Sequence, residues 1–193
     1  MMRARLLEAT VELLIERGYA GTSTTLVSER AGVSRGAQLH HFPSKAALVV
    51  AAVEHLTRVR GEELGRAAGA VPRGRDRTRA VLEMLGDHFT SPVFTAALEL
   101  WVAARTDAEL LAAVAPLEQR VGRDAHRLTV DLLDVDERQP GNRELIQATL
   151  DLVRGLGLAD TISDDGARRR RILDQWARTL DAALVRPATE ERP

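Results

Sequence analysis

Residues 25–42, TLVSERAGVSRGAQLHHF, contain two short segments with helical spacing, separated by the turn sequence AGVS. Ser23 or Thr24 can cap the first segment, Gly32 can end it, and Ser34 can cap the second. Alanine and glycine in the turn are small enough to let two helices cross closely, and the valine can anchor the turn. This pattern predicts a helix-turn-helix.

Helical spacing recurs in the rest of the chain, and no segment alternates polar and apolar residues for long enough to predict a strand. We expect a first helix over about residues 3–17 that Gly18 ends, and a fourth helix from Lys45 to about Ala68. Five more helices are expected near residues 75–90, 92–105, 107–134, 142–157 and 165–186. The predicted fold is therefore all-α, with an N-terminal three-helix head, a larger helical domain and about nine helices.

The composition is that of an ordinary globular protein, with 45% apolar and 28% charged residues. The chain has no cysteine, which excludes disulfides, thiolate zinc sites and cysteine nucleophiles. No apolar run approaches the roughly 18 residues of a membrane span, and the N-terminus reads as a helix, so we expect a cytoplasmic protein. Residues 1–60 hold eight Arg or Lys against five Glu, and this mildly basic head permits binding to nucleic acid.

Residues 18–48, GYAGTSTTLVSERAGVSRGAQLHHFPSKAAL, resemble the DNA-binding head of the tetracycline-repressor (TetR) family of bacterial regulators. The matching elements are the GY turn, the TS pair, the AGVS turn, the HF ending of the recognition helix and the PSK-x-x-L start of the fourth helix. The resemblance implies a helix-turn-helix DNA-binding domain over residues 1–48. It also implies a helical ligand-binding and dimerisation domain over residues 49–193.

The third helix of such a head enters the major groove, and its first residues reach the edges of the bases. Arg35 is expected to pair with guanine and Gln38 with adenine, while Ala37 is expected to meet a thymine methyl group. Gly36 allows the backbone to approach the DNA closely.

Phosphate contacts are expected on both sides of this helix. Ser23, Thr24 and Thr25 lie at the N-terminus of the second helix, where free amides, the helix dipole and hydroxyl groups favour a phosphate. Lys45 is the only lysine in the chain, and it is expected to reach the DNA backbone on the other flank.

The chain departs from the family at two adjacent positions. The family usually has Leu-Tyr where this chain has Gln38-Leu39, and the tyrosine hydroxyl is expected on a phosphate. Leu39 cannot make that bond. Either His40 takes the contact to the DNA backbone, or the helix is rolled so that Leu39 packs inward and Gln38 faces the groove.

The adjacent residues His40 and His41 admit three interpretations. A metal site is disfavoured, because adjacent helical residues point about 100° apart and no carboxylate or third histidine is near in sequence. We predict that at least one of the two contacts a phosphate and that His41 packs partly against the first helix. The alternative is a pair of structural histidines at a helix end. We predict no metal, no cofactor and no catalytic residue.

A small-molecule pocket is predicted in the larger domain, since large or adaptable side chains gather there and the resemblance implies one. His88 and His126 are its candidate polar anchors. The alternative is that these residues only form the core. The predicted lining is Met84, His88, Phe89, Phe94, Leu98, Trp101 and His126.

The last two long helices are predicted to form a four-helix bundle with those of a second subunit, which is the usual dimer of the family. The alternative is the core of a single subunit. The predicted interface consists of Leu145, Thr149, Leu152, Leu156, Ile172, Trp176, Ala183 and Leu184.

These features together predict a homodimeric, sequence-specific transcriptional regulator, most simply a repressor that a small-molecule effector releases from a near-palindromic operator. One alternative is a regulator or activator with the same head that needs no ligand. Another is an all-α carrier or enzyme, although no nucleophile–base pair, carboxylate dyad or metal-ligand spacing supports an enzyme.

Overall fold

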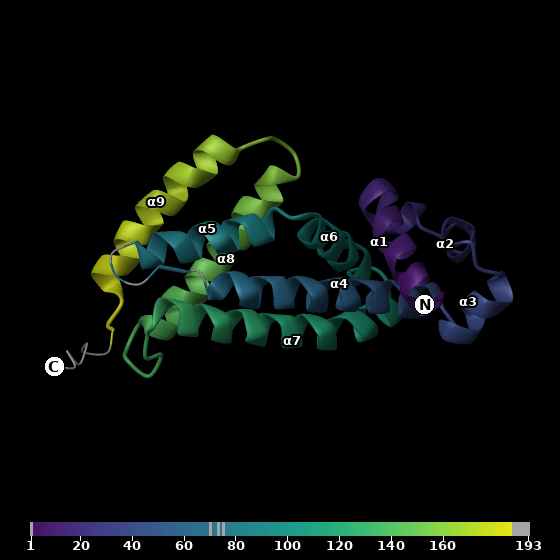
Figure 1. Cartoon of the computed structure of the whole chain (residues 1–193), viewed down its shortest axis with the longest axis horizontal. Helices are drawn as coiled ribbons and strands as arrows, with labels where there is room; N and C mark the ends of the chain where they lie inside the picture. Colours follow the sequence, from purple (N-terminus) through teal and green to yellow (C-terminus); the bar gives the residue numbers. More distant parts are fainter. Residues whose placement is uncertain (1, 70, 73, 75, 187–193) are drawn as a thin grey trace. The chain divides into compact units, whose positions relative to one another are not determined.

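The structure is a computed structural model that describes residues 2–69, 71, 72, 74 and 76–186. This part of the chain contains nine α-helices and no strand, so the all-α prediction is confirmed (Figure 1). None of these helices is both long enough and apolar enough to cross a membrane. The helices are α1 (Met2–Gly21), α2 (Thr24–Ala31), α3 (Arg35–His41), α4 (Lys45–Ala68), α5 (Arg77–Phe89), α6 (Pro92–Ala104), α7 (Ala108–Leu133), α8 (Asn142–Asp160) and α9 (Gly166–Ala183).

The described residues form two compact units. The first contains residues up to 63 together with residues 91–121, and the second contains residues 64–90 and 122–186. The predicted head therefore shares its unit with α6 and with the first part of α7. The functional division at residue 48 stays a prediction, because packing alone does not separate the head there.

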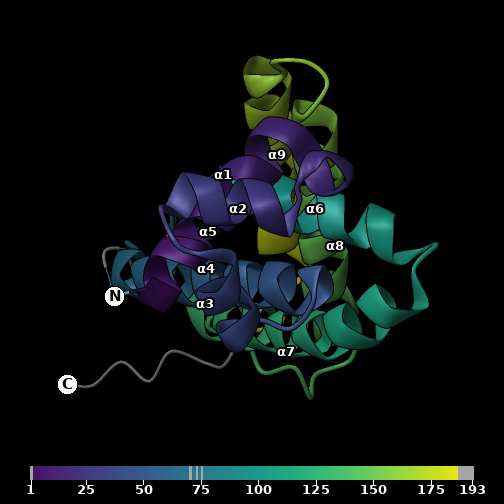
Figure 2. The same cartoon turned by 90° about the vertical axis from the view of Figure 1, so that its right-hand side faces the viewer.

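The first unit has two apolar clusters, and α4 contributes to both. Leu48 and Ala52 face a cluster built with α1, α2 and Phe42, whereas Val49 and Val53 face a cluster built with α1, α6 and α7. Burying one such large apolar side chain contributes about 1.5–3 kcal/mol. The fourth helix is thus the common support of the helix-turn-helix (Figure 2) and of the helices behind it.

In the second unit α5 packs against both α8 and α9 (Figure 1). Gly86 on α5 allows a close approach, since a Cβ atom there would lie 2.9 Å from Cδ1 of Leu173 on α9. Asn142 is fully buried at the start of α8; its Nδ2 donates to the carbonyl oxygens of Asp136 and Val185 at 2.9 and 2.8 Å. These bonds fix the chain that follows α9 to the loop before α8.

Candidate nucleic-acid interface

Local interactions define both helices of the helix-turn-helix. The Ser23 hydroxyl accepts a hydrogen bond from the Leu26 amide at 3.2 Å, and the Ser34 hydroxyl accepts one from the Ala37 amide at 3.3 Å. Gly32 ends α2 with φ 60°, a left-handed conformation that favours glycine. The predicted caps and the predicted turn are therefore confirmed.

An arginine on α2 holds the motif against α1. Arg30 donates from Nη2 to Glu16 at 2.8 Å and from Nη1 to Glu12 at 3.2 Å. The hydrogen bond from Arg30 lowers the pKa of the Glu16 carboxyl. Arg30 thus serves to position α2 against α1.

The exposed side of α3 carries four kinds of chemistry: a guanidinium, bare backbone, an apolar side chain and imidazoles. Arg35, Gly36, Leu39, His40 and His41 are all exposed. A Cβ atom at Gly36 would have no neighbour within 4 Å, so the backbone there is open to a ligand. This surface can offer hydrogen bonds to base edges and positive or polar contacts to phosphates.

The expectation that Gln38 faces the groove is wrong. Its side chain is fully buried, and Nε2 donates to the Phe42 carbonyl oxygen at 2.8 Å. Phe42 lies one helical turn further on and is itself buried, with 5% exposure, so both side chains point into the core. A rolled helix with Leu39 inward is excluded in the same way, because Leu39 is 47% exposed.

The other predicted contacts on α2 and α3 lie near the protein surface. Ser23 and Thr25 are exposed, whereas Thr24 and Ala37 are half-buried. His41 is exposed, and its ring lies 5.6 Å from that of His40; its partial packing against α1 stays a prediction. No cluster of three or more metal-ligating side chains occurs in the described residues.

Lys45 has a partner within the chain that the sequence did not indicate. Its ammonium donates to the Tyr19 carbonyl oxygen at 2.6 Å and lies 4.0 Å from the centre of the Tyr19 ring. Burial lowers the pKa of Lys45, with the charge of Asp107 acting in the opposite direction. The ammonium has two further N–H donors, so Lys45 positions the backbone at Tyr19 while its contact to a phosphate stays a prediction.

Glu99 of α6 also binds the backbone of Tyr19. Glu99 Oε2 accepts a hydrogen bond from the Tyr19 amide at 3.2 Å, across 80 residues of sequence. Gly18, the residue before Tyr19, has φ 64° and ψ 179°, a conformation open almost only to glycine. The sequence signalled the turn through Gly18 but gave no indication of Glu99 or of the partner of Lys45.

Gly18→Ala is expected to destabilise the first unit by about 2 kcal/mol or more, because the backbone would be strained. The new Cβ atom would also lie 2.5 Å from Glu99 Oε2 and displace that carboxylate. Thermal unfolding followed by circular dichroism should show a midpoint lowered by roughly 4–8 °C. Gly61→Ala is the matched control, since a Cβ atom at this exposed position of α4 meets nothing within 4 Å; an equal loss in both variants would contradict the prediction.

The predicted pocket residues are divided between the two units, so their meeting in one pocket stays a prediction. Phe94 and Trp101 stack edge to face at 5.8 Å in the first unit, where Leu98 also lies. Met84, His88, Phe89 and His126 belong to the second unit. His126 Nε2 lies 2.7 Å from Glu137 Oε2, and this hydrogen bond lowers the pKa of Glu137. His126 is therefore already engaged by its own chain.

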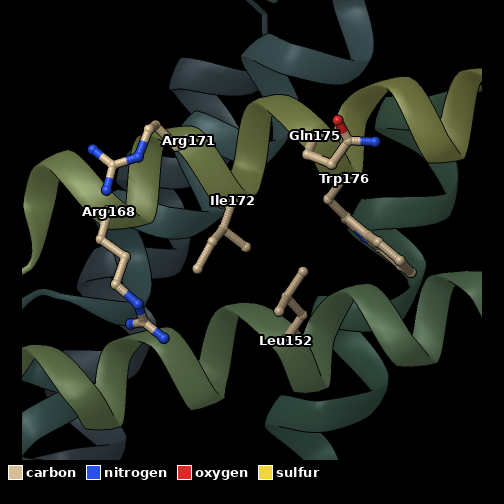
Figure 3. Close-up of a pocket in the computed structure, with 6 residues that line it drawn as sticks. All are labelled: Leu152, Arg168, Arg171, Ile172, Gln175 and Trp176. Atoms are coloured by element: carbon tan, nitrogen blue, oxygen red, sulfur yellow. The ribbon is translucent and has the colours of Figure 1, made fainter.

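The outer side of α8 and α9 has an apolar depression of about 570 Å³. Figure 3 shows Leu152 of α8 and Ile172 of α9 pointing toward each other there, with Trp176 beside them. Arg168, Arg171 and Gln175 complete the lining.

Three of the predicted interface residues are buried within the second unit instead: Thr149, Leu156 and Leu184. Thr149 also accepts a hydrogen bond from Trp176 Nε1 at 2.9 Å. The prediction that these three side chains lie on an outer face is therefore wrong, because they point into the core. The accessible members of the predicted set are Leu145, Leu152, Ile172, Trp176 and Ala183.

Comparison with known proteins agrees with this architecture. Residues 6–52 match the family model described as bacterial regulatory proteins, tetR family. An HTH-type transcriptional regulator of Pseudomonas putida, CymR, is 29% identical over 98% of this chain and 93% of its own length. An uncharacterised HTH-type transcriptional regulator of Mycobacterium tuberculosis is 28% identical over 89% of this chain and 84% of its own. The crystal structure of a transcriptional regulator from Pseudomonas aeruginosa PAO1 has a TM-score of 0.74 and 26% identity, covering 94% of this chain and 90% of that one.

Proposed function

Because the chain belongs to the TetR family of bacterial regulatory proteins and is a DNA-binding transcriptional regulator, we propose that it is a homodimeric repressor released from its operator by a small molecule. The observation that carries the proposal is the exposed side of α3, which places Arg35, Leu39 and His40 on the surface of a rigid helix-turn-helix. Such a helix reads base edges, while its neighbours hold the phosphates. A repressor of this kind acts in the cytoplasm, where the bacterial chromosome lies.

The dimer is proposed through the accessible apolar side chains of α8 and α9. Leu152, Ile172 and Trp176 line a depression that faces solvent in the single chain, and an apolar surface of this kind favours association. A two-fold axis would make each subunit contribute the same residues. The two α3 helices would then read half-sites about 34–36 Å apart.

Release by an effector requires that the small molecule bind the DNA-free conformation more tightly than the DNA-bound one. Coupling of this kind is typically about 1–3 kcal/mol, or roughly 5- to 150-fold in operator affinity. The release mechanism is supported in this chain by the apolar cluster that α4 shares with α6 and α7, because a shift of α6 or α7 would move α4 as well.

Selection of bound sequences from random double-stranded DNA tests the DNA-binding part of the proposal. We expect a near-palindrome whose half-sites are one helical turn apart. Enrichment of a single half-site would contradict the dimer, and no enrichment at low salt would contradict sequence-specific reading by the free protein.

The release step is tested with compounds that raise the unfolding temperature of the purified protein. Each compound is added at saturating concentration to the complex with the selected operator, and the affinity is measured by fluorescence anisotropy. Binders that leave operator affinity unchanged would favour a regulator that does not respond to those compounds.

A further inference from the structure

We propose that Leu39 is a specificity-determining residue that recognises the C5-methyl group of a thymine in each operator half-site. The inference rests on the proposed function, because it assumes that α3 lies in the major groove. It concerns an apolar side chain at a position for which the family pattern predicts a phosphate contact.

Leu39 lies on the exposed side of α3. Leu39 is 47% exposed, although the neighbouring Gln38 is fully buried and Phe42 is 5% exposed. The Gln38 amide is anchored to the Phe42 carbonyl at 2.8 Å, which fixes the rotation of this short helix. Leu39 therefore stays on the surface without a strained or rolled helix.

Leu39 has two near neighbours on the surface of α3. Positions three and four residues earlier on a helix are its surface neighbours, and these are Gly36 and Arg35. Gly36 has no side chain, and a Cβ atom there would meet nothing within 4 Å. The leucine is thus flanked by open backbone on one side and by the guanidinium proposed to read guanine on the other.

The chemistry of the major groove determines what an exposed leucine can contact. Base edges in the major groove present donors and acceptors, and the only alkyl group among them is the thymine methyl. A leucine cannot replace the hydrogen bonds that water makes with polar edges, so its contact with them would cost free energy. An exposed leucine beside Arg35 consequently favours half-sites that place a thymine at its contact point.

The sequence alone predicted that Ala37, and not Leu39, contacts the thymine methyl group. Ala37 is half-buried, and its amide donates to the Ser34 cap. Its methyl side chain is also shorter than the leucine side chain. Leu39 is the residue of α3 that combines a large apolar side chain with an exposed position, at 47% exposure.

The test replaces thymine by deoxyuridine, which differs only by lacking the C5-methyl group. Each thymine of the selected operator is replaced in turn, symmetrically in both half-sites, and affinities are measured for wild type and Leu39→Ala. At one thymine position we expect wild-type binding to weaken about fourfold per half-site and about 15-fold overall, from the free energy of burying one methyl group. Leu39→Ala should weaken binding to the thymine operator similarly and show no further loss with deoxyuridine there.

At every other thymine, deoxyuridine should affect wild type and Leu39→Ala equally. The unfolding midpoint of Leu39→Ala should match that of wild type, which separates recognition from folding. Leu39→Met keeps an apolar side chain of similar volume and should retain the sensitivity to the methyl group. The inference is overturned if no thymine loses its methyl dependence in Leu39→Ala, or if the half-site contains no thymine. A selection that yields no palindrome would contradict the proposed function itself.

Discussion

Arg35→Ala is expected to weaken binding to the selected operator by between about 30-fold and about 10⁴-fold. A bidentate arginine–guanine pair contributes about 1–3 kcal/mol of discrimination, and a dimer would lose it in both half-sites. The side chain is exposed and lies next to Gly36, where the backbone is open. Removing it should therefore change recognition without changing the core. Anisotropy titrations on the selected operator, together with a repeated selection, measure both the affinity and the base preference.

Arg35→Lys is the matched variant for this experiment. Lysine keeps the positive charge but lacks the planar pair of donors, so it should not restore the base preference. If Arg35 instead contacts a phosphate, Arg35→Lys will bind almost as wild type. In that case Arg35→Ala will weaken binding to all sequences alike and lower the salt dependence, contrary to our prediction.

Leu152→Asp is expected to convert the proposed dimer to monomers and to weaken operator binding by about 10²- to 10⁴-fold. The substitution places a carboxylate among the residues that line the apolar depression on α8 and α9, opposite Ile172 (Figure 3), where a partner subunit would desolvate it. A monomer loses the effective concentration that links the two heads, which accounts for a loss of this size. Sedimentation equilibrium and the operator titration measure the two effects on the same sample.

Leu111→Asp is the control for this prediction, since Leu111 is 51% exposed on α7 and lies outside the proposed interface. The same chemical change there should leave both assembly and affinity unchanged. Circular dichroism shows whether the Leu152→Asp monomer keeps its helices. A folded Leu152→Asp variant that remains dimeric would place the interface elsewhere on the molecule.

The sequence predicted the helices well because their ends depend on residues three or four positions apart. Ser23 and Ser34 cap α2 and α3, Gly32 ends α2, and α4 begins at Lys45. Each of these signals is read within one helical turn. The helix-turn-helix, with α3 beginning at Arg35, could therefore be located without the tertiary structure.

The faces of the helices were harder to predict because they depend on packing partners far away in sequence. Polarity alone favours a buried Leu39 and an exposed Gln38. Phe42 is buried, however, and Gln38 lies on the same side of α3 as Phe42. A closer reading of the one-turn spacing from Gln38 to Phe42 could have found this. In α8, the same uncertainty of phase placed Thr149 and Leu156 on an outer face, although both are buried.

By itself, then, the sequence determined an all-α chain with a helix-turn-helix at its N-terminus, since caps, turns and helical periodicity are local interactions. Only the tertiary structure decided that Leu39 and not Gln38 is presented on α3, and that Lys45 binds the Tyr19 carbonyl at 2.6 Å. Only the tertiary structure, too, joined Glu99 to the Tyr19 amide across 80 residues. The physical reason is that burial and hydrogen bonding are shared between helices, and the partner of each side chain is fixed when those helices pack.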